Sequence, residues 1–252
     1  MPRYKLTIEY DGSPFSGWQR QENAPSVQQT LEEAAERLTG NFARVQGAGR
    51  TDAGVHATGQ VAHIDTVRTW EAFKLQGALN HFLRPAPVAI VAAEVTHDEF
   101  HARFDAIERS YTYRIVNRRS PLTFDHRLAW KVQMPLDVDA MRAGAAYLIG
   151  NHDFTTFRSV HCQAKSPVKT VDEITIETHG QHINIHVRAR SFLHNQVRSF
   201  VGTLEQVGAG KWAPADVGAA LAARDRARCG TVAPPDGLYL TNVRYRDPLG
   251  AE

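Results

Sequence analysis

The chain has little cysteine and no long apolar run. Its two cysteines, Cys162 and Cys229, lie far apart without a Cys-x-x-Cys spacing, which predicts neither a disulfide framework nor a zinc site. No apolar run approaches the roughly 18 residues of a membrane-spanning helix, and the first residues enter a strand pattern without the apolar segment of a signal peptide. We therefore expect a cytoplasmic protein with reduced thiols and no membrane contact.

Several catalytic signatures are absent as well. The chain has no Gly-x-Ser-x-Gly motif, no phosphate loop of the Gly-x-x-x-x-Gly-Lys type and no Cys/His signature, so acyl transfer is not supported. His182 and His186 share one face of an expected strand, but no third or fourth ligand stands nearby in sequence, so no metal site is predicted. The net charge of +2 is too small to indicate a nucleic-acid-binding domain by itself.

The overall composition is that of an ordinary globular protein. Apolar residues make up 42% of the 252 residues and charged residues 22%, which is typical of folded domains with a sizeable core. Arginines gather in two short spans, which fit phosphate-facing patches or solvated surfaces about equally well. These spans are Arg103, Arg109, Arg114, Arg118 and Arg119, and then Arg224, Arg226 and Arg228.

Hydrophobic periodicity predicts an α+β fold with two related halves, 1–118 and 119–252. A loose echo of residues 97–104 at 152–158 supports this division. We expect the halves to share a continuous, mainly antiparallel sheet, with helices on one face and a basic cleft on the other. On one expected helix, the apolar stripe is Phe73, Ala78, Leu79 and Phe82. The expected elements are strands at 5–10, 88–95 and 107–117, and helices after the caps Ser26 and Asp137, at 71–82 and near 194–207.

The most distinctive segment is Gly-Ala-Gly-Arg-Thr-Asp-Ala-Gly-Val-His-Ala at 47–57. Its glycines let the backbone adopt positive φ and approach a ligand closely, so we expect a shaped turn between two strands at a sheet edge. Asp52 would then point away from a rigid platform. An Asp in a Gly-rich turn often only hydrogen-bonds its own backbone, so local chemistry leaves a structural role and a catalytic role open.

Two further segments carry candidate functional side chains. The alternating strand 109–114 places Tyr111 and Tyr113 on one face, where tyrosine packs in a core more often than it stacks on a base. The segment 192–202 predicts a helix in which Arg198 stands among residues suited to packing. An arginine in that position needs a partner.

These segments together resemble the TruA family of tRNA pseudouridine synthases. The resemblance rests on GRTDAGVHA, on Arg-x-Tyr-x-Tyr from Arg109, on Val-Arg ending at Arg198, on Phe-His-Ala-Arg at 100–103 and on Gly-Leu-Tyr-Leu at 237–240, and it covers residues 3–246. It implies that Asp52 is the nucleophile, that Tyr111 lies against the target base and that Arg198 forms an ion pair that keeps Asp52 ionised. It also implies substrate contacts from Arg50, Tyr111, Phe100, His101, Ala102 and Arg103.

The resemblance further implies a specific reaction and partner. The expected reaction isomerises uridine to pseudouridine at positions 38 to 40 in the anticodon stem-loop of tRNA, without a cofactor or a metal, in a homodimer. Arg50 would fill the space that the target nucleotide leaves. One alternative is a non-catalytic RNA-binding protein of the same fold, and a more distant one is a metal-dependent RNA-modifying enzyme.

Overall fold

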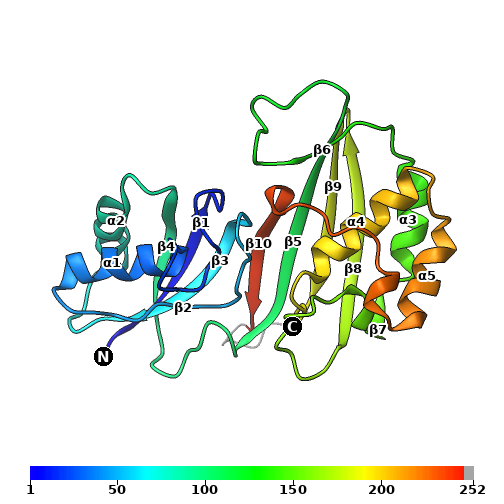
Figure 1. Ribbon diagram of the computed structural model, residues 1–252. Helices are drawn as coiled ribbons and strands as arrows, with labels where there is room; N and C mark the ends of the chain where they lie inside the picture. Colours follow the sequence, from blue (N-terminus) through cyan, green and yellow to red (C-terminus); the bar gives the residue numbers. More distant parts are fainter. Residues whose placement is uncertain (247–252) are drawn as a thin grey trace. The chain divides into compact units, whose positions relative to one another are not determined.

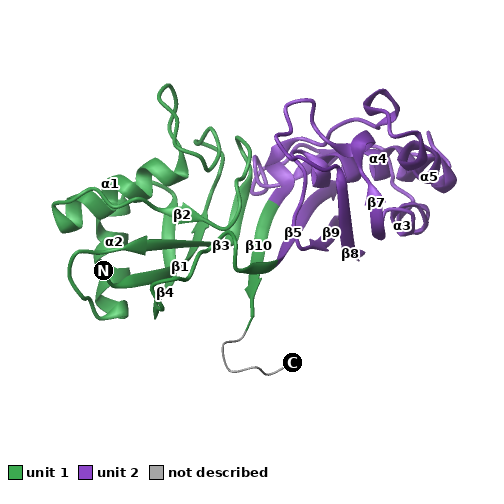
Figure 2. Cartoon of the chain, turned by 90° about the horizontal axis from the view of Figure 1, so that it is seen from below, with its two compact units in different colours: residues 1–107, 239–252 green, residues 108–238 purple. Residues whose placement is uncertain are grey.

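The structure, a computed structural model, describes residues 1–246 (Figure 1). By its internal contacts the chain divides into two compact units, residues 1–107 with the C-terminal segment from Tyr239, and residues 108–238 (Figure 2). The last strand belongs to the first unit apart from Leu238, and the expected halves 1–118 and 119–252 stay a prediction. Residues 247–252 of the expected second half lie outside the described residues.

The first unit is built on four paired strands in the order β4-β1-β3-β10. β1 is antiparallel to both β3 and β4, whereas β10 is parallel to β3, and the short β2 pairs with β3 beside them. Alternate residues of β1, Tyr4, Leu6 and Ile8, are buried, as the polar/apolar alternation predicts. The bounds are β1 Arg3–Tyr10, β2 Gln46–Gly47, β3 His56–Asp65, β4 Val88–Thr96 and β10 Leu238–Tyr245.

Two helices complete the first unit, α1 (Val27–Thr39) and α2 (Ala72–Leu83). The Ser26 side chain caps α1 by accepting from the Gln29 amide at 3.3 Å, and the helix ends at Gly40 with a φ of 72°. The stripe expected on α2 is correct for Leu79 but wrong for Phe73: the helix buries leucines at 75, 79 and 83, and Phe73 is 84% exposed. Phe73 lies about 200° around the helix from Leu75, so packing the leucines inward turns the phenylalanine outward.

The second unit contains four strands in the order β5-β9-β8-β7, each antiparallel to its neighbour, with β6 parallel to β5. Three helices, α3, α4 and α5, pack against one another, and α3 also packs against β8. Phe154, Phe157 and Phe200 form a buried aromatic cluster with ring centroids 5.2 to 6.4 Å apart. The bounds are β5 Ala106–Asn117, β6 Trp130–Val132, α3 Val138–Ala146, β7 Gly150–Asp153, β8 Val168–His179, β9 His182–Ala189, α4 Gln196–Gly208 and α5 Pro214–Ala223. Three short 3-10 helices, η1 Thr155–Phe157, η2 Arg226–Arg228 and η3 Pro235–Gly237, also belong to this unit.

The α+β class predicted from the sequence is confirmed. Within residues 1–246 there are five α-helices and ten strands, and the strand pairing is mixed and mostly antiparallel. The Asp137 cap is also present, since its carboxylate accepts from the Ala140 amide at 2.9 Å. Among these same residues, none of the helices has the length and apolar character needed to span a bilayer. The basic cleft stays a prediction.

Candidate active site

The loop that carries Asp52 continues the pairing of β2 with β3. Gln46 and Gly47 pair with His63 and Ala62, and the Ala48 amide donates to the Val61 carbonyl at 2.7 Å. The Gln60 side chain then donates to the Gly49 carbonyl at 2.9 Å. After these contacts the loop leaves the strand, so the expected turn between two strands is confirmed. β2 lies off the main path of the sheet and pairs with β3, whereas β3 itself lies between β1 and β10.

The connection between β1 and α1 holds the main chain on both sides of Asp52. The Trp18 amide donates to the Thr51 carbonyl at 3.0 Å, and the Gly54 amide donates to the Phe15 carbonyl at 3.3 Å. Gly17 has a φ of 92°, and a Cβ there would stand 2.5 Å from the Thr51 oxygen. Only glycine allows this close approach. The backbone around Asp52 is therefore held by a second segment of the chain as well as by its own turn.

Two buried aromatic residues, Tyr10 and Trp18, contact the turn. The hydroxyls of Tyr10 and Thr51 share a buried hydrogen bond of 2.8 Å, and burial raises the pKa of Tyr10 to about 12, so the phenol stays protonated. Trp18 is only 2% exposed, and a Cβ on Gly47 would stand 2.5 Å from its ring. Trp18 is buried because its ring fills the space that Gly47 leaves.

The turn presents Arg50 and Asp52 while it buries the residue between them. Arg50 is exposed, Thr51 is buried and Asp52 is partly exposed. The hydrogen bond that closes the turn runs from the Val55 amide to the main-chain carbonyl of Asp52 at 3.1 Å. The closing bond thus uses the main chain of Asp52, and the structural and catalytic interpretations of its carboxylate both stay open.

The Phe-His-Ala-Arg segment divides into buried and surface residues. Phe100 and Ala102 are buried, and the Ala102 amide donates to Nδ1 of His63 at 3.1 Å. Burial, together with the charge of Arg3, lowers the pKa of His63 to about 4, which agrees with a neutral ring whose Nδ1 accepts. Phe100 and Ala102 thus anchor the segment.

The two other residues of this segment face outward. Arg103 is exposed and His101 is partly exposed. Nδ1 of His101 accepts from the Arg103 amide at 3.1 Å, so its Nε2 carries the proton and donates to Gln46 at 3.1 Å. The segment consequently lies beside the β2 end of the loop. Its contact there, Gln46, stands six residues before Asp52 in the chain. Of the four residues, His101 and Arg103 have side chains that reach the surface, and the expected substrate contacts stay a prediction.

In the second unit, Tyr111 and Tyr113 have different surroundings although they share one face of β5. Tyr113 is fully buried; its hydroxyl donates to the Pro234 carbonyl at 2.7 Å, and burial raises its pKa. Tyr111 is partly exposed and meets the ring of Phe192 edge-on at 5.2 Å. Tyr113 is therefore a core residue, and Tyr111 has ring surface that a base could stack on.

Arg198 is oriented by two hydrogen bonds within the second unit. Its Nε donates to the Ala233 carbonyl at 2.7 Å, and its Nη1 donates to the Asn195 side chain at 3.0 Å. These bonds engage two of the five N–H groups of a planar guanidinium and so set the direction of the others. Asn195 has a φ of 63°, an uncommon conformation for a residue other than glycine.

The candidate residues are thus distributed over both units. Asp52, Arg50 and residues 100–103 belong to the first, and Tyr111 and Arg198 belong to the second. Within the second unit one loop supports both candidates, because Phe192 contacts Tyr111 and Asn195 holds Arg198. The sequence did not reveal these supporting roles, nor those of Tyr10, Gly17 and Trp18. Over residues 1–246, no group of three or more metal-ligating side chains is present.

A family model described as tRNA pseudouridine synthase matches residues 6–105 and 145–246. The chain belongs to this family, whose members are isomerases. Two matched stretches of similar length agree with the two related halves expected from the sequence, and the resemblance seen there is confirmed.

Curated relatives are similar over almost the whole chain. A protein of Dinoroseobacter shibae named tRNA pseudouridine synthase A is 62% identical over 99% of both chains. A relative of the same name from Paracoccus denitrificans is 62% identical over 98% of both chains. Another, from Parvibaculum lavamentivorans, is 63% identical over 97% of this chain and all of the relative.

Proposed function

We propose that this protein converts uridine to pseudouridine at positions 38 to 40 in the anticodon stem-loop of tRNA, with Asp52 as the nucleophile. The observation that carries the proposal is the turn at 47–57. It matches the family signature, and its main chain is held on both sides of Asp52 by the connection between β1 and α1. Relatives that share about 60% of the sequence are named tRNA pseudouridine synthase A, which supports pseudouridine formation in tRNA.

The chemistry requires a flipped nucleotide and a covalent step. Leaving the base stack costs a few kcal/mol, and the exposed Arg50 beside Asp52 would occupy the vacated space. Asp52 would attack either C1′ of the ribose or C6 of the base. The N1–C1′ bond breaks and the uracil turns. A C5–C1′ bond then forms, the bond to the Asp52 carboxylate breaks, C5 loses its proton to solvent and N1 takes up a proton. The atoms of substrate and product balance without an oxidant, a reductant or a cofactor.

Two residues of the second unit would assist this step. Tyr111 would cover the detached base with its partly exposed ring, because base–aromatic stacking contributes roughly 1–3 kcal/mol. Arg198 would keep Asp52 ionised, and its orientation by Asn195 and Ala233 suits a guanidinium that must meet a carboxylate. The proposal also includes a homodimer in which one tRNA touches both subunits.

The experiment that tests this function is release of tritium from tRNA labelled at C5 of uridine. Wild-type protein should release tritium, and Asp52→Asn should bind tRNA but lose on the order of a million-fold in turnover. A non-catalytic RNA-binding protein would bind and release nothing, and a metal-dependent enzyme would lose its activity in EDTA. Substantial turnover by pure Asp52→Asn protein, with deamidation excluded, contradicts the nucleophile assignment.

A further inference from the structure

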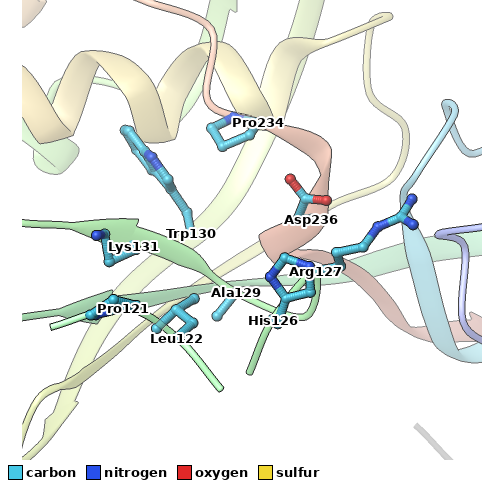
Figure 3. Close-up of a pocket in the computed structure, with 9 residues that line it drawn as sticks. All are labelled: Pro121, Leu122, His126, Arg127, Ala129, Trp130, Lys131, Pro234 and Asp236. Atoms are coloured by element: carbon cyan, nitrogen blue, oxygen red, sulfur yellow. The ribbon is translucent and has the colours of Figure 1, made fainter. Parts of the chain in front are cut away.

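The second unit has a pocket that is not lined by any of the candidate catalytic side chains. Its volume is about 310 Å³, near the lower end of pockets that hold small ligands. The walls come from the loop between β5 and β6, from the start of β6 and from the segment leading into β10 (Figure 3). The lining residues are Pro121, Leu122, His126, Arg127, Ala129, Trp130, Lys131, Pro234 and Asp236.

The lining combines apolar and cationic groups. Two prolines, a leucine, an alanine and a tryptophan supply apolar surface. The lining also contains the cations Arg127 and Lys131, the imidazole of His126 and one carboxylate, Asp236. Figure 3 shows Lys131 and Arg127 on opposite sides of the pocket. A nucleotide presents the complementary chemistry, a flat aromatic base and an anionic phosphate. A purely apolar ligand would not interact favourably with the cations, and inorganic phosphate would leave the apolar walls without a contact.

The backbone of Arg127 supports a ligand-binding role for its side chain. Arg127 has a φ of 61°, which glycine would adopt without the strain that a side chain brings. An arginine held in that conformation places a guanidinium at the pocket at a conformational cost. Such outliers gather at binding sites, where the surrounding structure maintains them.

The walls of the pocket are held in place before any ligand arrives. Trp130 pairs with Ile115 of β5, and the Ala129 amide donates to the Asp125 carbonyl at 3.1 Å. On the other side, the Pro234 carbonyl accepts from the Tyr113 hydroxyl at 2.7 Å. A preformed site loses less conformational entropy on binding than a flexible one. Pro234 also follows Ala233, whose carbonyl holds Arg198, so the pocket adjoins the segment that orients this candidate catalytic residue.

We propose that this pocket binds one unstacked nucleotide of the RNA substrate, separate from the uridine that reacts. The occupant must be unstacked because neighbouring bases cover both faces of a base within a helix. Its base contacts the apolar walls, and its phosphates contact Arg127 and Lys131. This inference rests on the proposed function in one respect, that the substrate is tRNA.

The first test removes two positive charges from the pocket. Full-length Arg127→Gln/Lys131→Gln is compared with Lys74→Gln/Lys211→Gln, which removes two charges from exposed lysines outside the pocket. Binding of tRNA is measured between about 50 and 200 mM salt. The pocket variant should bind about tenfold more weakly, and its log–log salt slope should fall by about 1.4, or 0.7 for each single-strand phosphate contact. Equal affinities and slopes in the two double variants overturn the proposal.

The second test concerns the base. Trp130→Leu should weaken tRNA binding by about 5- to 150-fold with an unchanged salt slope, whereas Trp130→Phe should retain most of the affinity. If neither variant weakens binding, the site takes phosphate alone, and if both weaken it equally, the ring of residue 130 does not hold a base; either result overturns the nucleotide assignment. If Trp130→Leu does not fold, Trp130→Phe and the charge variants still test whether RNA binds at the pocket.

The remaining outcomes separate this inference from its alternatives. If wild-type protein releases tritium but the charge variants bind tRNA equally, the pocket assignment fails and the proposed function stands. If wild-type protein releases none, the proposed function fails whatever the pocket variants show. A changed sedimentation coefficient of Arg127→Gln/Lys131→Gln with an unchanged salt slope would show that this face contacts a second copy of the chain, and would overturn RNA binding there.

Discussion

Replacing Gly17 with alanine should disturb Asp52 although residue 17 belongs to a different segment. The new Cβ would stand 2.5 Å from the Thr51 carbonyl oxygen and 3.1 Å from the Asp52 carbonyl carbon. The main chain must therefore move, which costs roughly 1–3 kcal/mol of folding free energy, as overpacking does. The φ of 92° adds about 1–3 kcal/mol of strain. Because a shift of about 1 Å at a reacting group can lower a rate roughly a hundredfold, turnover should fall as well.

Gly40→Ala is the matched control for this prediction. Gly40 has a φ of 72°, but an added Cβ there meets nothing within 4 Å, so the variant carries the backbone strain without the contact. Urea unfolding should place Gly17→Ala below Gly40→Ala in stability by about 1–3 kcal/mol. Single-turnover tritium release should fall in Gly17→Ala alone. If the two variants have the same stability and the wild-type rate, the β1–α1 connection does not position Asp52.

Three further predictions concern single side chains. Arg198→Met should move the acid limb of the pH–rate profile to higher pH, whereas Arg50→Ala should leave that limb in place. Arg50→Ala should instead slow the reaction of stem-paired uridines more than that of unpaired uridines. Equal behaviour of the two variants contradicts these roles. Tyr111→Ala should slow single-turnover reaction on tRNA more than Tyr111→Phe, and a wild-type rate for Tyr111→Ala would make it an ordinary packing residue. His63 has a folded-state pKa of about 4, below its usual 6.5, so the stability it confers is present above pH 6.5 and is lost as the pH falls towards 4. His63→Asn, which keeps an acceptor for Ala102, should lose less stability than wild type between pH 7 and pH 4.5 in urea unfolding; equal losses contradict a buried neutral ring.

Some features could be predicted because a short segment contains the whole signal. The helix after Ser26 begins and ends where its cap and Gly40 indicate, since capping involves only residues within one turn. The alternation of β1 identifies its buried residues in the same way. The family could be identified from short motifs, because the nine residues around Asp52 are specific enough to be matched without knowledge of the fold.

Other features depend on contacts between residues that are distant in the chain. Tyr111 and Tyr113 have the same local pattern, and only the segment that brings the Pro234 carbonyl to the Tyr113 hydroxyl distinguishes a core residue from an accessible one. Likewise, Tyr10 meets Thr51 across 41 residues, and Trp18 is buried because Gly47 leaves room for its ring. Periodicity shows that a strand or helix has an apolar face that must be buried. Packing of the whole chain selects the segment that buries it, and no local pattern contains that information.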